Sequence, residues 1–175
     1  ARNRDSILDD LQDKLNRPQP EKRIIKEKKM FRCSWNVGDV FAYKLTSTYA
    51  ETKGLVNKYI YFIKCDEMMW HPGHIIPIVN VFWTMSDTIL SLEDVIANAY
   101  LPQFYVPAVY EKNKSIRKMY RLSIITRKEK AIPRNNLLYL GNSTVHKIDN
   151  EDVNPFNVSW KDFEKYIIDD YLEWI

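Results

Sequence analysis

Three runs between residues 35 and 83 decide the fold: Trp35-Asn-Val-Gly-Asp-Val-Phe-Ala-Tyr-Lys-Leu45, Lys58-Tyr-Ile-Tyr-Phe-Ile-Lys64 and Ile75-Ile-Pro-Ile-Val-Asn-Val-Phe-Trp83. Aromatic and β-branched residues dominate all three runs, and such residues favour β-strands. Turn residues separate them, among them the Pro-Gly pair before the third run. We therefore expect strands at 40–46, 58–65 and 75–84, in a sheet against which the rest of the chain packs.

The length and composition are those of one globular domain. With 175 residues, 45% of them hydrophobic, the chain can bury a core without disulfides or a metal. We divide it into an N-terminal helix and basic linker (1–30) and a single α+β domain (31–175). Only four glycines occur, scattered along the chain, which argues against a glycine-rich phosphate-binding loop.

The flanking segments supply further elements. A short amphipathic helix is expected at 5–16, a loop with at most a helical turn at 47–56, a partly helical stretch at 86–100, a hairpin of strands 104–111 and 116–125, and a strand at 136–140. Ser159 is placed to cap a final helix, with Asp162 three residues later. The apolar stripe of that helix is Trp160, Phe163, Ile167, Tyr171 and Trp174.

Together these elements predict an α+β fold. We expect a twisted antiparallel sheet, or an SH3-like partly open barrel, of about six strands. The C-terminal amphipathic helix should pack on one face of this sheet. The N-terminal helix is too short to be stable alone, so it should dock on the body, on a partner or on a domain upstream of it.

Charge is segregated although the net charge is only +3. Residues 21–32 and 111–134 are mainly basic, whereas residues 149–175 are mainly acidic. There is no signal peptide, no run long enough to span a membrane, and only two cysteines, which indicates a protein of the reducing cytoplasm.

Candidate catalytic and metal sites are sparse. Cys65, His71 and His74 offer three zinc ligands, one fewer than a structural zinc site requires, so we interpret the two histidines as part of a turn. A cysteine nucleophile at Cys33 or Cys65 lacks the strand-turn-helix setting that would activate it. We predict no catalytic residue, no metal and no cofactor. The alternative, a hydrolase or transferase, requires His71 and His74 to converge in a pocket.

The basic hairpin is the second candidate site. Cations interleaved with aromatic residues on a twisted sheet are typical of small barrels that bind single-stranded nucleic acid. The pI of 8.7 lies below the level that normally indicates such binding. The residues that would contact nucleic acid are Lys112, Lys114, Arg117, Lys118 and Arg121.

One family resemblance is carried by residues 35–83. The turn Trp35-x-x-Gly-Asp-Val-Phe-Ala42, followed by Lys58–Ile63 and by Ile76–Val79, resembles a family of small bacterial immunity proteins that neutralise polymorphic toxins. The resemblance implies a mostly β fold, entered through a Gly-Asp turn, with no catalytic residues.

The functional expectation follows from these observations. We expect a non-enzymatic interaction protein, an immunity protein that binds a toxin; the alternative is a nucleic-acid-binding module. A protein partner should contact exposed aromatic and arginine side chains near the basic hairpin, because such residues dominate interface energetics. These are Tyr110, Arg117, Tyr120 and Arg121.

Overall fold

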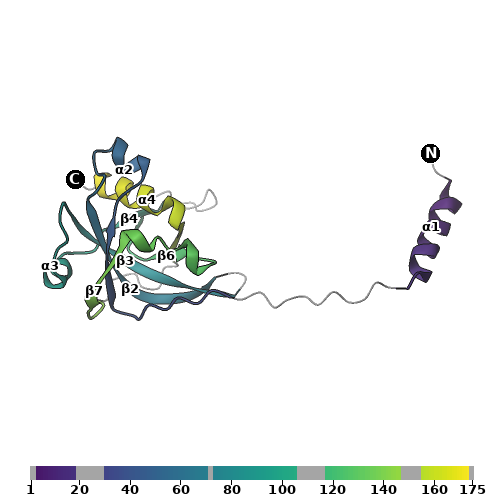
Figure 1. The fold of residues 1–175 in the computed structure, drawn as a ribbon, viewed down its shortest axis with the longest axis horizontal. Coiled ribbons are helices and arrows are strands. Elements are labelled where there is room, and N and C mark those ends of the chain that lie inside the picture. The colour runs from purple at the N-terminus through teal and green to yellow at the C-terminus, as the bar shows by residue number, and fades with distance from the viewer. Residues whose placement is uncertain (1–2, 19–29, 71–72, 106–116, 147–154, 174–175) are drawn as a thin grey trace.

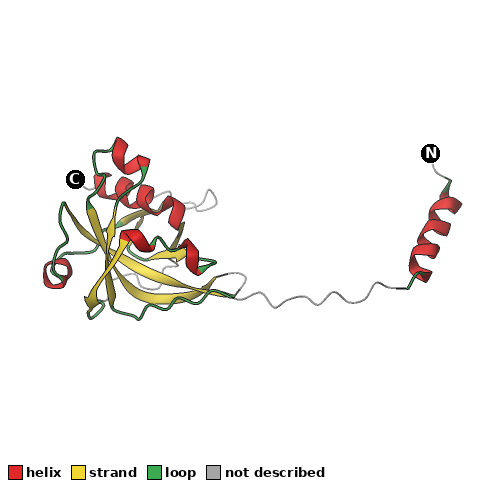
Figure 2. Ribbon diagram, in the orientation of Figure 1, coloured by secondary structure: helices red, strands yellow, loops and turns green. Residues whose placement is uncertain are grey.

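The computed structural model describes residues 3–18, 30–70, 73–105, 117–146 and 155–173. It has the expected α+β architecture, with one open six-stranded sheet and helices packed against it (Figures 1 and 2). The strand order is β7-β1-β2-β3-β6-β8. The strands are β1 (Asp39–Lys44), β2 (Tyr59–Trp70), β3 (His74–Ser86), β6 (Leu122–Ile125), β7 (Leu137–Asn142) and β8 (Phe156–Ser159).

The three central strands confirm the prediction from residues 35–83. β1 pairs antiparallel with β2, and β2 pairs antiparallel with β3 along most of its length. β2 and β3 are longer than expected. β2 continues past an irregularity at Cys65 to Trp70, and β3 begins at His74, after a turn in which Gly73 has φ +92°.

One pairing and one interruption correct the expected all-antiparallel sheet. β6 and β8 are parallel, with Leu122 opposite Phe156 and Ile125 opposite Ser159, so the sheet is mixed. The expected strand 116–125 is also interrupted at Tyr120–Arg121, and its two halves belong to different sheets.

The first half of that strand forms a hairpin, as predicted. β4 (Gln103–Tyr105) pairs antiparallel with β5 (Arg117–Met119). The tip of the hairpin, 106–116, lies outside the described residues.

The C-terminal helix α4 (Trp160–Glu173) covers one face of the sheet, as its apolar stripe predicted. Phe163 and Ile167 are buried in the larger core, while Trp160 and Tyr171 pack at its border. Trp174 lies outside the described residues. Ser159 Oγ donates a hydrogen bond to Asp162 Oδ2 (2.6 Å), which joins the cap to the first turn.

The opposite face carries a smaller core under α3 (Leu92–Ile96). Ser91 caps this helix by accepting from the Asp94 N–H. The helical turn expected within 47–56 is α2 (Thr48–Thr52), beside α4.

The N-terminal helix α1 (Arg4–Asn16) buries none of its side chains and lies apart from the sheet (Figure 1). Contacts with the sheet begin at Phe31, which is buried and exchanges hydrogen bonds with the start of β3. No helix within the described residues is long and apolar enough to cross a membrane.

Candidate functional site

The residues considered for zinc binding have other contacts. His74 is buried, and its Nδ1 accepts from the Phe31 N–H at 2.9 Å. Cys65 Sγ lies 3.4 Å from both the Ile78 carbonyl oxygen and Asn80 Oδ1. His71 is outside the described residues, and within the described part of the chain no three metal-binding side chains gather.

The two cysteines are free thiols in settings that suppress thiolate formation. Burial raises the pKa of Cys33, and it raises the pKa of Cys65 to about 11, although Arg121 works in the opposite direction. A nucleophilic cysteine needs a lowered pKa. Cys33 and Cys65 are therefore better described as packing residues than as nucleophiles.

The residues predicted on the basic hairpin are only partly within the described structure. Tyr110, Lys112 and Lys114 fall outside it, and Arg117 and Lys118 lie on β5 without a described side chain. Tyr120 is half-buried. Arg121 makes an ion pair with Asp66 (Nη2 to Oδ2, 2.5 Å) next to the Cys65 irregularity, which gives it a structural contact of its own.

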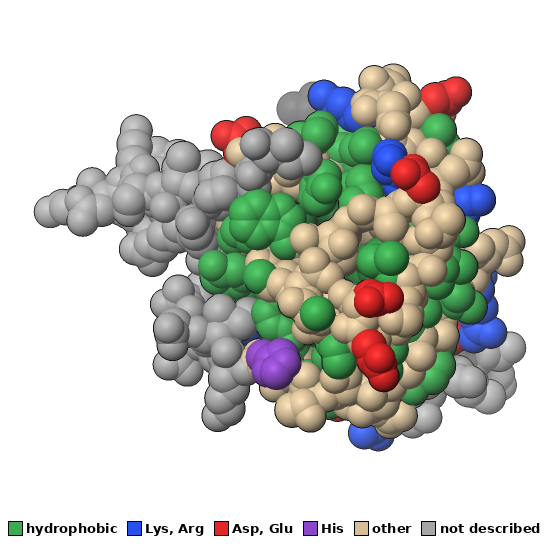
Figure 3. All heavy atoms as spheres, turned by 90° about the vertical axis from the view of Figure 1, so that its left-hand side faces the viewer, with side chains coloured by type: hydrophobic (Ala, Val, Ile, Leu, Met, Phe, Trp, Pro, Cys, Tyr) green, Lys and Arg blue, Asp and Glu red, His purple; other side chains and the backbone are tan. Residues whose placement is uncertain are grey.

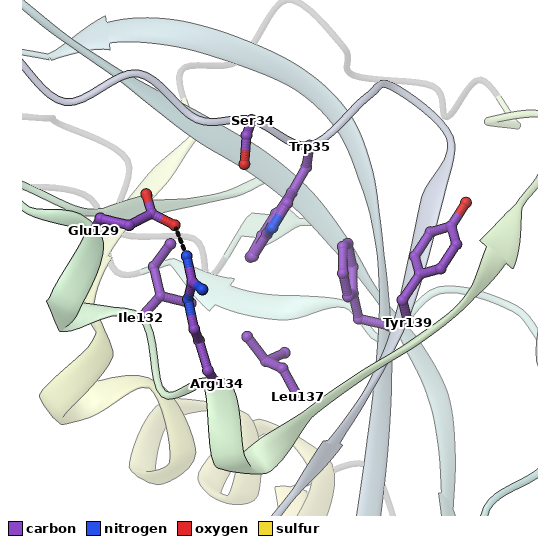
Figure 4. Close-up of a pocket in the computed structure, with 8 residues that line it drawn as sticks. Ser34, Trp35, Glu129, Ile132, Arg134, Leu137 and Tyr139 are labelled. Carbon is purple, nitrogen blue, oxygen red and sulfur yellow. Dashed lines mark hydrogen bonds and ion pairs between the residues drawn. The ribbon is translucent and has the colours of Figure 1, made fainter.

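A partly open pocket of about 220 Å³ lies elsewhere, over the junction of β1 and β7 (Figure 4). Four segments contribute to it: the chain before β1, β1 itself, β7, and the two 3-10 helices η1 (Glu129–Ala131) and η2 (Arg134–Asn136) with the two residues between them. Its lining residues are Ser34, Trp35, Phe41, Glu129, Ile132, Arg134, Leu137 and Tyr139.

Aromatic rings form one wall of the pocket. The ring centroids of Trp35 and Phe41 are 4.5 Å apart, and those of Phe41 and Tyr139 are 5.6 Å apart. The buried Lys64 fixes the backbone at Trp35 by donating from Nζ to the Trp35 carbonyl oxygen at 2.6 Å. Lys64 also pairs with Glu67 at 3.1 Å, so its charge is not left uncompensated. The wall is therefore held in place from β2 beneath it.

The Gly-Asp turn fixes the other side of the site. Gly38 has φ +92°, and a Cβ there would lie 2.4 Å from the Ser143 carbonyl oxygen, so both the backbone angle and the close approach require glycine. Asp39 is buried; its Oδ2 accepts from the Asn36 N–H at 2.6 Å and its Oδ1 from Asn142 Nδ2 at 2.9 Å. The motif that carries the family resemblance thus has a structural task, which is to join the start of β1 to the end of β7.

The opposite rim of the pocket is charged. Arg134 Nη2 lies 2.5 Å from Glu129 Oε1. Both side chains are largely exposed, so this pair contributes little to stability. An exposed pair of this kind can change partners on binding at small cost.

β7 also forms an edge of the sheet. Its only neighbour among the described strands is β1. Leu138 and Tyr139 are 45% and 55% exposed, and the strand Leu-Leu-Tyr-Leu-Gly-Asn carries no charge. Edge strands usually carry charges or prolines that discourage pairing with another chain. β7 has neither.

Sequence reasoning did not identify this site. The strand at 136–140 was predicted, but its lack of charged residues was the signal that could have marked it as a binding edge. The contribution of Ile132 and Arg134 depends on the fold of the segment between β6 and β7, and no local pattern indicates it.

On a different side of the molecule, the left-hand side of Figure 1, the described residues show no concentration of cations. Figure 3 shows hydrophobic side chains near the centre of this side, with acidic groups among them and the described cationic groups separated toward its rim.

Comparisons of the chain with protein-family models, with curated proteins and with solved structures found no match.

Proposed function

We propose that this chain acts by binding another protein at the pocket and the β7 edge, and that it does so as an immunity protein that neutralises a toxin. One observation carries the binding proposal: a partly open aromatic pocket lies directly beside an uncharged strand edge. The toxin-neutralising role rests on the resemblance of residues 35–83 to bacterial immunity proteins.

The dimensions of the pocket favour a protein partner over a small substrate. Small-molecule sites usually have volumes of about 300–1,000 Å³ and enclose most of the ligand. This pocket is about 220 Å³ and partly open. It suits one inserted side chain, which is how anchor residues fill the centre of a protein interface.

The side chains present suit binding better than catalysis. Exposed tyrosine and arginine are the residues that contribute most to interface energetics, and here Tyr139 and Arg134 border the pocket from two sides. Its two charged groups, Glu129 and Arg134, are paired with each other.

The experiment is site-specific photo-crosslinking in the cells that produce the protein. A benzophenone amino acid replaces Tyr139, and in a control it replaces Tyr166, an exposed tyrosine on α4. We expect a discrete crosslinked protein from position 139 only. The captured protein is then purified, and Tyr139→Ala should weaken its binding to the chain at least tenfold in a direct titration.

The toxin role has a separate readout. Expression of the captured protein alone should stop growth, and co-expression of this chain should restore it. A captured protein that is harmless would remove the immunity role and leave the binding role. Equal crosslinking from positions 139 and 166, or none from 139, would contradict the binding site itself.

A further inference from the structure

Some of the backbone N–H and C=O groups of β7 lie in the plane of the sheet and point away from its neighbour β1. In an antiparallel ladder, alternate residues direct their N–H and C=O groups to opposite sides. The Leu45 N–H donates to the Lys58 carbonyl oxygen on the β2 side, whereas the Lys44 carbonyl oxygen accepts from Asn136, just before β7. Even-numbered residues of β1 therefore face β7 in this part of the strand.

The register then identifies the outward groups. Ala42, an even-numbered residue, lies opposite Leu138, so the backbone groups of Leu138 are used on β1. Tyr139 lies opposite Phe41, so its N–H and C=O are directed to the side of β7 that has no neighbour among the described strands. Tyr139 thus offers two things at once: a ring in the wall of the pocket and a backbone ready to pair with an added strand.

The segment before β7, which supplies one rim of the pocket, is positively charged. Between residues 127 and 134 there are four basic residues and one acidic residue, all of them exposed. Arg134 and Glu129 line the pocket itself. We call this segment the basic rim; it consists of Arg127, Lys128, Glu129, Lys130 and Arg134 with the residues between them.

We propose that β7 binds an extended, acidic segment of the protein partner as an additional strand, with one apolar side chain of that segment inserted in the pocket. This rests on the proposed function and specifies its partner chemistry. Main-chain hydrogen bonds to an edge strand accept only an extended chain, and pockets for alternate side chains then provide specificity. The basic rim selects carboxylates because opposite charges favour encounter and fix the register.

Charge also argues against a second copy of this chain as the occupant. In an antiparallel pair of β7 strands, the basic rim of each copy would meet residues 141–145 of the other. That stretch, Gly-Asn-Ser-Thr-Val, contains no carboxylate. An acidic segment from another protein satisfies the rim, whereas a second copy does not.

The test uses the full chain and a displayed library of random twelve-residue peptides as the probe. We expect the enriched peptides to have net negative charge and to alternate apolar with polar residues. Synthetic copies of them should shift the backbone amide resonances of Leu137–Asn142 and the indole resonance of Trp35 in nitrogen-labelled protein.

Two pairs of variants separate the contributions. Tyr139→Pro removes the outward N–H together with the ring, whereas Tyr139→Thr removes only the ring; proline is tolerated on an edge where the N–H faces outward. We expect Tyr139→Pro to bind the peptides at least tenfold more weakly than Tyr139→Thr.

The double variant Lys128→Glu, Lys130→Glu tests the basic rim and should lose at least tenfold in affinity for the peptides. The matched control Lys53→Glu, Lys161→Glu changes exposed residues of other segments and should lose less than twofold. Unchanged far-ultraviolet circular dichroism shows that each variant is folded.

Several outcomes would overturn the proposal. Enriched peptides that are basic, or equal affinities of Tyr139→Pro and Tyr139→Thr, would exclude strand addition of an acidic segment. Dimerisation abolished by Tyr139→Pro would assign the edge to a second copy. Binding of a single-stranded oligonucleotide that needs Lys128 and Lys130 but is indifferent to Tyr139→Pro would assign the rim to nucleic acid. In each case a partner that crosslinks at position 139 would leave the broader proposed function intact.

Discussion

The face of the sheet under α4 and the β7 edge are built from the same kinds of residue and differ in what those residues contact. Phe163 on α4 is fully buried, with its ring 5.8 Å from Phe62 and 5.3 Å from Tyr43. Tyr139 on β7 is 55% exposed; its ring packs on Phe41, and its hydroxyl lies 3.5 Å from Asp39 Oδ1. The aromatic content that predicted the sheet therefore serves stability in one region and leaves an exposed surface, the proposed binding site, in the other.

Buried polar groups sharpen this contrast. Under α4, Glu164 is buried and is fully used: it accepts from the Tyr43 hydroxyl at 3.0 Å and from the backbone N–H groups of Thr46 and Ser47. Burial and the neighbouring Glu164 carboxylate raise the pKa of Tyr43. At the β7 edge, by contrast, the charged pair is exposed and the strand has no second neighbour among the described residues. Mutations should accordingly separate into those that affect folding and those that affect binding.

The largest expected effect is at Phe163. Phe163→Ala removes a fully buried ring and should lower the free energy of unfolding by about 3–5 kcal/mol. Tyr139→Ala should lower the free energy of unfolding by less than about 1 kcal/mol, because removing an exposed ring takes away few stabilising contacts. Urea denaturation measures both, and similar losses for the two variants would break the distinction between the regions.

Glu164 gives the next largest effect. Glu164→Gln keeps the shape of the side chain but places an NH₂ group against backbone N–H donors, and should cost about 2–3 kcal/mol of unfolding free energy. Glu173→Gln, on an exposed position of the same helix, is the matched control and should be neutral. Urea denaturation measures the loss of stability, and a separate titration measures affinity for the partner. We expect both variants, when folded, to bind the partner as tightly as the parent does. A folded Glu164→Gln protein that lost its partner would extend the binding region to the α4 face.

Much of the fold could be predicted because its signals are local. The three runs between residues 35 and 83 contain the strand formers and the turns that separate them, and the stripe through Phe163 and Ile167 identifies α4. The parallel pairing of β6 with β8 could not be predicted in this way. Its partners are joined by a long connection, and β8 has only four residues, of which Val158 is the one buried side chain.

The site was less predictable than the fold because it is assembled from distant segments. Trp35 and Phe41 lie within the Gly-Asp motif at residues 35–42, but Tyr139 reaches Phe41 across about a hundred residues of sequence, through strand pairing alone. The interface residues predicted on the basic hairpin, with Tyr120 and Arg121 the two whose side chains are described, stay a prediction. Separate alanine substitutions there and at Tyr139 would show which surface the partner uses.

Gly38 tests the junction between the two regions, with a smaller expected effect. Gly38→Ala introduces a side chain at φ +92° and against the Ser143 carbonyl oxygen, and should cost about 2 kcal/mol of unfolding free energy. Gly54→Ala is the matched control. It has φ +69° with nothing within 4 Å of the added Cβ, so only backbone strain of about 1 kcal/mol applies. Because Gly38 joins the start of β1 to the end of β7, only Gly38→Ala should also speed amide hydrogen exchange in β7. Equal exchange in the two variants would show that the β7 edge does not depend on this turn.

The last effect is expected at Cys65, and it appears only in alkali. The pKa of this thiol is raised from 9.0 to about 11 by burial, so the folded protein retains a proton that the unfolded chain loses. The stabilisation is complete below pH 9 and decreases as the pH rises from 9 to 11, because there the unfolded state is favoured by ionising first. Cys65→Ala should make the fall in unfolding free energy between pH 9 and pH 11 smaller by about 2 kcal/mol. Below pH 9 the free energies of unfolding of the variant and the parent should change with pH in the same way. Urea denaturation at pH 8, 9, 10 and 11 measures it. If the free energy of unfolding falls equally with pH in Cys65→Ala and in the parent, the Cys65 thiol ionises equally easily in the folded and unfolded states. The side of the sheet away from α4 would then be more open to water at Cys65 than its packing indicates.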